Sequence, residues 1–148
     1  MNRSDNAEAV RTEQRVALYR QGNPEADRWA KGCGAITHCL ETQARVFAMA
    51  DSLAARGVSG DGMPLFEVLR AADRVASAGM WLVVHETYAR QVYLDGRALT
   101  SEDFKPDPEG HTGGSLNMVP AYTGYMAANA ITGSCADSSR LPIAPFRM

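Results

Sequence analysis

The fold of this chain is decided by residues 64–94, which read PLFEVLRAADRVASAGMWLVVHETYARQVYL. Apolar residues recur there at helical spacing, which predicts one long helix or two abutting helices. Gly79 either marks a bend or allows a close contact with a neighbouring helix. The run from Gly79 to His85 is apolar nearly all round, so we expect it to be buried on several sides. Trp81 and His85 lie one helical turn apart, which is more typical of a core pair than of a ligand site.

The residues before this segment also favour helices. Loose helical periodicity and capping residues predict helices over 5–20, from Pro24 to about Trp29, and from about Ile36 to Ala55. Cys33 is expected in a turn between two glycines, and Cys39 is expected as a small buried group. The spacing of these cysteines and of His38 does not match a zinc site, so we predict no metal ligands here.

Composition narrows the function classes. The 148 residues suit one domain, with 45% apolar and 22% charged residues and a formal net charge of −2. This net charge does not indicate binding to nucleic acid or to anionic lipid. The charged first twenty residues and the lack of a long apolar run exclude a signal peptide or membrane span. We therefore expect a cytoplasmic protein that contacts neither membrane nor nucleic acid.

The segment with the clearest chemical character is Gly110-His111-Thr112-Gly113-Gly114-Ser115. We expect it to be a turn ahead of a helix over 118–131, with Asn117 as the N-cap and Pro120 in the first turn. Unpaired N–H groups at a helix N-terminus attract phosphate, and an imidazole can carry a proton near neutral pH. The alternative is that the glycines only let the backbone turn.

The same turn resembles a known motif. Gly110–Leu116 is similar to the Gly-His-x-Gly turn of the transketolase family of thiamine-diphosphate enzymes, and residues 108–122, with 72–82 upstream, are most similar to phosphoketolase-like proteins. The resemblance extends over about residues 63–133. Thr112 departs from the family, because most transketolases have Pro and typical phosphoketolases have Trp at this position.

The resemblance implies an enzyme that cleaves a C–C bond of xylulose 5-phosphate or fructose 6-phosphate with thiamine diphosphate and Mg²⁺. It implies that His111 is a catalytic residue that faces the reacting carbon of the sugar. Gly113 and Gly114 would lie against the cofactor, and His111, Thr112 and Ser115 would contact the substrate. No metal ligand is assigned within this chain.

The resemblance also implies a fold class that is mostly α. Residues 1–133 would be the helical N-terminal portion of a thiamine-diphosphate-binding α/β fold that is incomplete without its downstream parallel sheet, and residues 134–148 would be an irregular tail. Gly60-Asp61-Gly62 has the opening letters of the Mg²⁺ motif of these enzymes, but no Asn follows before His111, so we interpret it as a loop.

Three functions therefore remain open. In the first, the chain is part of the thiamine-diphosphate enzyme and is inactive alone: it requires a complementary chain or a homo-oligomer, or it is a truncated product of a longer gene. The alternatives are a non-catalytic helical interaction module, or remnant of an enzyme, and a small phosphate-binding protein that uses only the His111 turn.

Overall fold

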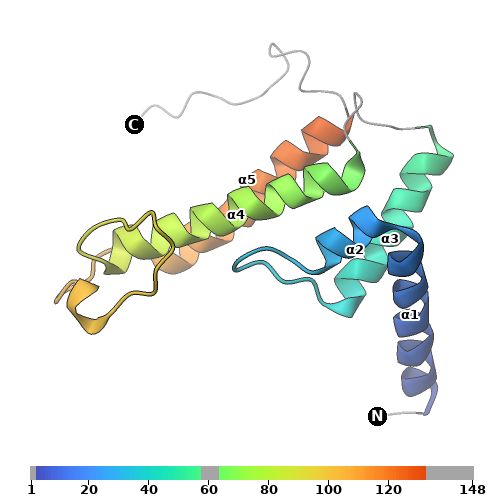
Figure 1. The fold of residues 1–148 in the computed structure, drawn as a ribbon, viewed down its shortest axis with the longest axis horizontal. Helices are drawn as coiled ribbons and strands as arrows, with labels where there is room; N and C mark the ends of the chain where they lie inside the picture. The colour runs from blue at the N-terminus through green and yellow to red at the C-terminus, as the bar shows by residue number, and fades with distance from the viewer. Residues whose placement is uncertain (1–2, 58–63, 133–148) are drawn as a thin grey trace.

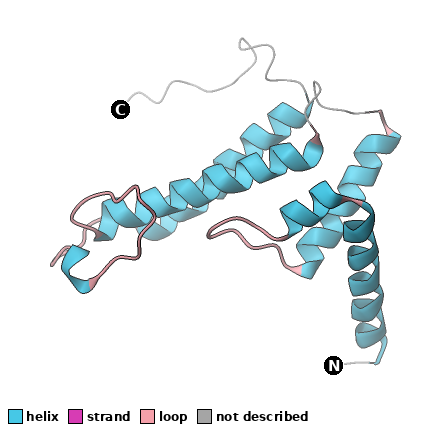
Figure 2. Ribbon diagram, viewed as in Figure 1, coloured by secondary structure: helices cyan, strands magenta, loops and turns pink. Residues whose placement is uncertain are grey.

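The computed structural model describes residues 3–57 and 64–132, and these form five α-helices and one short 3-10 helix (Figure 1). The elements are α1 (Arg3–Gly22), α2 (Pro24–Ala30), α3 (Leu40–Ala55), α4 (Leu65–Tyr88), the 3-10 helix η1 (Ser101–Asp103) and α5 (Thr112–Thr132). In these ranges the only β structure is two isolated bridges, Cys33–Ile36 and Ala89–Phe104 (Figure 2). The predicted mostly helical class is confirmed. The Gly60-Asp61-Gly62 segment and the predicted tail at 134–148 lie outside the described residues.

Two helices dominate the arrangement. α4 and α5 run side by side in opposite directions, and α1, α2 and α3 gather around the end where α4 begins (Figure 1). The loop 89–111 closes the far end of the α4–α5 pair, where α4 ends and α5 begins. The two ends of α4 therefore have different neighbours.

Aromatic packing joins the four helices that meet where α4 begins. The Tyr19 ring stacks on Phe47 with 4.2 Å between centroids, and Phe47 meets Trp29 and Phe66 edge-on at 6.0 Å. Each of these side chains comes from a different helix: Tyr19 from α1, Trp29 from α2, Phe47 from α3 and Phe66 from α4. Val16, Ala26 and Ala30 complete this core. The first four helices are thus joined by a single buried cluster, and burial of aromatic side chains supplies much of its stability.

The second helix has the local signals that its sequence predicts. Asn23 caps α2, because its side-chain oxygen accepts a hydrogen bond from the Ala26 N–H at 3.1 Å, and Pro24 occupies the first turn. The helices predicted over 5–20 and from Pro24 to Trp29 are confirmed, since α1 and α2 cover them.

The third helix begins later than the periodicity predicts. The segment 32–36 forms a tight turn in which Cys33 and Ile36 exchange two backbone hydrogen bonds of 3.0 Å. Gly32 and Gly34 adopt positive φ angles of 74° and 58°, which suit glycine. This turn takes Ile36 out of the helix, so α3 starts at Leu40. Cys33 lies in a turn as predicted, but Cys39 is exposed and the prediction of a buried thiol is wrong.

The long segment at 64–94 is one helix that ends at Tyr88. Gly79 is a point of close contact, because a Cβ built on it would lie 3.0 Å from Cγ1 of Val119 on α5. The prediction that Gly79 to His85 is buried on several sides is wrong. His85 is 1% exposed, whereas Trp81 and Leu82 are 38% and 47% exposed, because α5 covers only one side of α4 here.

Removal of the Phe47 ring tests the central cluster. We expect Phe47→Ala to lower the free energy of unfolding by about 3–5 kcal/mol, because it leaves a cavity between three aromatic rings. Urea denaturation followed by circular dichroism measures this change. The control is Leu18→Ala on α1, where the side chain is 67% exposed; it should change the free energy by less than about 0.5 kcal/mol. Equal effects of the two substitutions would contradict the assigned core.

Alanine substitutions at Gly79 in α4 and at Gly124 in α5 test the close contact between Gly79 and Val119. An alanine at Gly124 in α5 meets nothing within 4 Å, so Gly124→Ala should raise the free energy of unfolding by about 0.5–1 kcal/mol through helix propensity. Gly79→Ala brings the same propensity but presses its methyl group against Val119. We expect it to stabilise less than Gly124→Ala or to destabilise. The same denaturation assay measures both, and equal stabilisation would contradict a close contact at Gly79.

Candidate functional site

The candidate site lies where the loop 89–111 enters α5. α5 begins at Thr112, and the backbone N–H of Ser115 donates to the His111 carbonyl at 3.3 Å. The turn itself is at Gly110, whose φ is 124°. Thr112 to Ser115 are therefore helical, and the prediction that they form a turn ahead of a helix beginning near residue 118 is wrong.

The start of α5 changes two further residue assignments. Asn117 is not an N-cap, and Pro120 lies inside the helix rather than in its first turn. A proline at this position leaves the helix one hydrogen bond short. The Thr123 hydroxyl lies just beyond it and donates to the carbonyls of Val119 and Pro120 at 3.0 and 3.2 Å. The helix therefore starts one to two turns earlier than its proline suggested.

The predicted site residues share one helical turn that is fixed to the end of α4. The Thr112 hydroxyl donates to the Tyr88 hydroxyl at 3.0 Å, and Gly110 packs close to Thr87. His111, Gly113, Gly114 and Ser115 are exposed, and Thr112 is half-buried. The structure thus brings all five predicted residues together on an open surface rather than in a closed cavity.

The electrostatics of this turn favour an anion. The first N–H groups of a helix have no partner within it, and they carry the positive end of the helix dipole. The first turn of α5 has no acidic residue that would neutralise this end. An exposed imidazole at His111 adds a group that can donate or accept a hydrogen bond.

The described residues do not supply a whole cofactor site. A Cβ built on Gly113 or on Gly114 would meet nothing within 4 Å, so neither glycine forms a cradle against other parts of the chain. Within residues 3–57 and 64–132, no three His, Cys, Asp or Glu side chains are grouped to hold a metal ion. These described residues alone therefore do not fit thiamine diphosphate and Mg²⁺.

An internal ion pair gives the loop 89–111 its shape. Arg97 donates two hydrogen bonds of 2.7 Å to the Asp103 carboxylate, which also accepts from the Thr100 N–H and hydroxyl at 2.7 and 2.9 Å. The Arg97 guanidinium lies 3.9 Å from the centre of the Tyr93 ring. These hydrogen bonds hold the pKa of Asp103 far below its usual range, and those from Arg97 have the largest effect.

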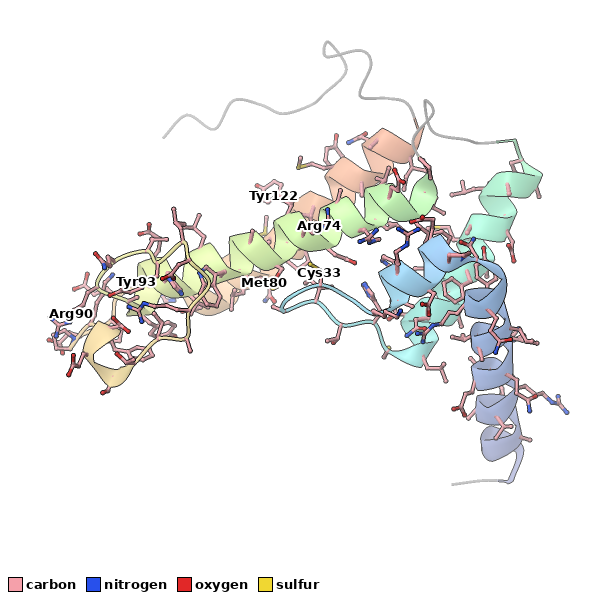
Figure 3. All side chains as sticks on the ribbon, viewed as in Figure 1. Cys33, Arg74, Met80, Arg90, Tyr93 and Tyr122 are labelled. Atoms are coloured by element: carbon pink, nitrogen blue, oxygen red, sulfur yellow. The ribbon has the colours of Figure 1, made fainter. Side chains whose placement is uncertain are left out.

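The cations of this loop each make a hydrogen bond within the chain. Arg97 is held by Asp103, and the Lys105 ammonium donates to the Glu86 carbonyl at 2.6 Å. Arg90 donates through Nε to the Phe104 carbonyl at 3.2 Å. Figure 3 shows Arg90 and Tyr93 at this end of the molecule. These side chains fasten the loop to the end of α4, which fixes the position of His111.

Beneath the loop, His85 acts as a buried anchor. Its Nδ1 accepts a hydrogen bond from the Tyr93 N–H at 3.1 Å, and its ring lies 4.3 Å from the Trp81 ring. The Trp81 indole N–H donates to the Tyr93 carbonyl at 3.1 Å. The two rings pack together as predicted, but only His85 belongs to the core, because Trp81 is exposed. The pair also orders the first part of the loop.

The cysteine and histidine residues at 33–39 have separate partners. His38 Nε2 lies 2.8 Å from Asp73 Oδ2, an interaction between residues 35 positions apart that the sequence did not indicate. Cys39 Sγ lies 3.3 Å from the Thr42 hydroxyl. Hydrogen bonding to Thr42 lowers the pKa of the Cys39 thiol.

Comparison of the chain with protein-family models, with curated proteins and with solved structures finds no match. Among the described helices, none combines the length and apolar character that a membrane span requires.

Substitution of Asp103 tests the internal ion pair. Because the folded-state pKa of Asp103 is depressed, its stabilisation is present above the unfolded pKa of about 4 and is lost as the pH falls further. At about pH 6, where the wild-type carboxylate is charged, Asp103→Asn should lower the hydrogen-exchange protection of amides at 90–104. Wild-type protection should approach that of the variant below about pH 4. Amides of α2 are the internal control, and equal protection of 90–104 in both proteins at the higher pH would contradict the ion pair.

Proposed function

We propose that the chain is the N-terminal helical part of a thiamine-diphosphate-dependent enzyme of sugar-phosphate metabolism, similar to phosphoketolases. In this proposal it presents His111 to a sugar phosphate in an active site that another polypeptide completes. The observation that carries the proposal is the exposed turn at His111, with unpaired helix N–H groups and no acidic residue in the first turn of α5.

Each site residue has a role that its position permits. The N–H groups of Gly113 and Gly114 would bind an anionic oxygen, and the exposed Ser115 hydroxyl would add a donor. His111 would hydrogen-bond to oxygens of the ketose and move a proton there. Thr112 would act by holding the turn to Tyr88. The reaction would be cleavage of a C–C bond in xylulose 5-phosphate or fructose 6-phosphate.

The completing polypeptide is a necessary part of this proposal. The 148 residues contain no complete Mg²⁺–diphosphate motif, so both the metal and the cofactor would be held by the downstream parallel sheet, either in a complementary chain or in a further part of the same protein. Large apolar side chains are exposed on α4 and α5 and support such a contact: Trp81, Leu82, Met118, Tyr122, Tyr125 and Met126. Figure 3 shows Tyr122 pointing away from the helix pair. A cytoplasmic location agrees with a sugar-phosphate substrate.

The second candidate is a non-catalytic helical interaction module. The same exposed apolar side chains favour it, since contiguous apolar surface marks a binding face. It differs from the enzymatic proposal in one respect: an interaction module would bind no ligand at His111 or at the first turn of α5. Binding of a sugar phosphate at this turn therefore separates the two.

Substitution of His111 tests the proposal. Titration with xylulose 5-phosphate should shift the amide resonances of Gly113 and Gly114 in a saturable manner, and His111→Ala should weaken this binding with no change in circular dichroism. With a complementary chain, thiamine diphosphate, Mg²⁺ and inorganic phosphate as the acceptor of the acetyl group, His111→Ala should lower acetyl phosphate formation by about 10²–10⁴-fold, the usual contribution of proton transfer.

The matched control is Asn117→Ala, at an exposed position two residues beyond Ser115 on the same helix. It should leave both binding and turnover unchanged. Undiminished turnover with His111→Ala would refute the role of the imidazole. If the sugar phosphate causes no shift at Gly113 or Gly114, the interaction module is the better account.

A further inference from the structure

A groove runs along the contact between α4 and α5, at the end of the pair where α4 begins and α5 ends. Its volume is about 460 Å³. Three of its residues are buried, Val68, Thr123 and Ala127, and the Thr123 hydroxyl donates to carbonyls of its own helix. The remaining apolar walls come from both helices: Ala71, Ala72, Val75, Met126 and Ala130. A groove of this size with mostly apolar walls is the usual form of a small-molecule site.

Two arginines of α4 form part of the groove wall. Arg70 is half-buried and Arg74 is exposed, and they lie one helical turn apart. An arginine side chain is not deprotonated in a protein, so both groups are cations. Like charges at this spacing on a helix repel each other. An anion bound between the two guanidinium groups would offset this repulsion.

Neither arginine has a counter-charge of its own. In the part of the chain that the structure describes, neither side chain makes an ion pair or a hydrogen bond, and Glu67, which also lines the groove, is paired with neither. Partial burial of an unpaired charge is unfavourable, and Arg70 is half-buried. The other arginines described without an ion pair are all exposed: Arg11, Arg15, Arg56, Arg74 and Arg90. The wall at Arg70 therefore favours an anionic ligand.

We propose that this groove binds a free carboxylic acid with a linear aliphatic chain, with its carboxylate at Arg70 and Arg74 and its chain between α4 and α5. A planar guanidinium group matches a carboxylate and donates paired hydrogen bonds to it. The two arginines and Glu67 leave one net positive charge in the wall, so an anion is preferred to a cation. The apolar walls favour an apolar body, which a small inorganic anion lacks.

The groove is separate from the turn at His111, which lies at the opposite end of α4. Figure 3 shows Arg74 on α4, away from Tyr93 of the loop 89–111. The two sites also differ in their walls, because the turn at His111 is an open polar surface and the groove is lined by apolar side chains. A carboxylic acid can therefore bind in the groove whether or not a sugar phosphate binds at His111.

Probes that share an aliphatic chain but differ in head group test this assignment: octanoate, octan-1-ol and octylammonium. Binding is followed through the amide resonances of Ala72, Ala127 and Ala130 in the whole chain. We expect octanoate to bind in the millimolar range, as befits a ligand of this size. Octan-1-ol should bind about tenfold more weakly, since it lacks the charge, and octylammonium should cause no saturable shift. Butanoate should bind at least about tenfold more weakly than octanoate, because its shorter chain buries less apolar surface.

Two variants locate the site. Arg70→Gln combined with Arg74→Gln should weaken octanoate binding at least about tenfold and remove the preference for octanoate over octan-1-ol. Its matched control is Arg11→Gln combined with Arg15→Gln, which removes two exposed arginines at the same spacing on α1 and should leave binding unchanged.

The second variant, Ala71→Phe, leaves both arginines in place and fills the apolar part of the groove, so it should abolish octanoate binding. Its matched control is Ala121→Phe, at an exposed position of α5 outside the groove. This control should bind octanoate normally. Circular dichroism should be the same for all four variants as for the wild type.

Selective octanoate binding that weakens with the shorter chain and is lost in both groove variants, but not in their controls, supports the proposal. Absence of a saturable shift with octanoate, equal binding of octanoate and octylammonium, equal binding of butanoate and octanoate, or normal binding in either groove variant would each overturn it. Shifts of the same resonances on dilution without a ligand would show that a second copy of the chain covers the groove, and this result would also overturn the proposal.

Discussion

The packing of Phe66 against Trp29 and Phe47 is the contact on which the rest of the structure depends. Phe66 lies near the start of α4, so this contact fastens the long helix to the three helices before it. Everything that follows in the chain is positioned from α4. α5 packs along α4 at Gly79 and Val119, and the loop 89–111 is fastened to the carboxyl end of α4. The orientation of His111 is therefore a consequence of a helix anchored at its opposite end.

The sequence predicted the helices but not all of their ends. Regular apolar spacing was sufficient for α1, α2 and the body of α4, because each of these helices buries one face. The start of α3 was missed because Ile36 fits the helical spacing, yet the Cys33–Ile36 turn removes it from the helix. The start of α5 was missed because Gly113, Gly114 and Pro120 are poor helix formers. There the contact with α4 and the Thr112–Tyr88 hydrogen bond outweigh local propensity.

The His111 turn and the His38–Asp73 pair differ in how far a sequence can indicate them. The five residues of the His111 turn are consecutive or nearly so, and therefore a short motif contains them. His38 and Asp73 are 35 residues apart, and neither is unusual in its own segment. Their pairing depends on the angle at which the loop 31–39 meets α4, and that angle follows from Gly34 lying against Ser77. No periodicity or spacing rule conveys such a contact.

The apolar run near Gly79 is less buried than its sequence predicts. Apolar residues on all sides of a helix indicate that every side is covered in the working protein. In this chain α5 covers one side of α4, and Trp81 and Leu82 remain in contact with solvent. Surface of this kind is unfavourable in water at a cost that grows with its area, so a sequence retains it for a reason. In the enzyme proposed above, the part that completes the site would cover α4 and α5 and would also close the open side of the turn at His111.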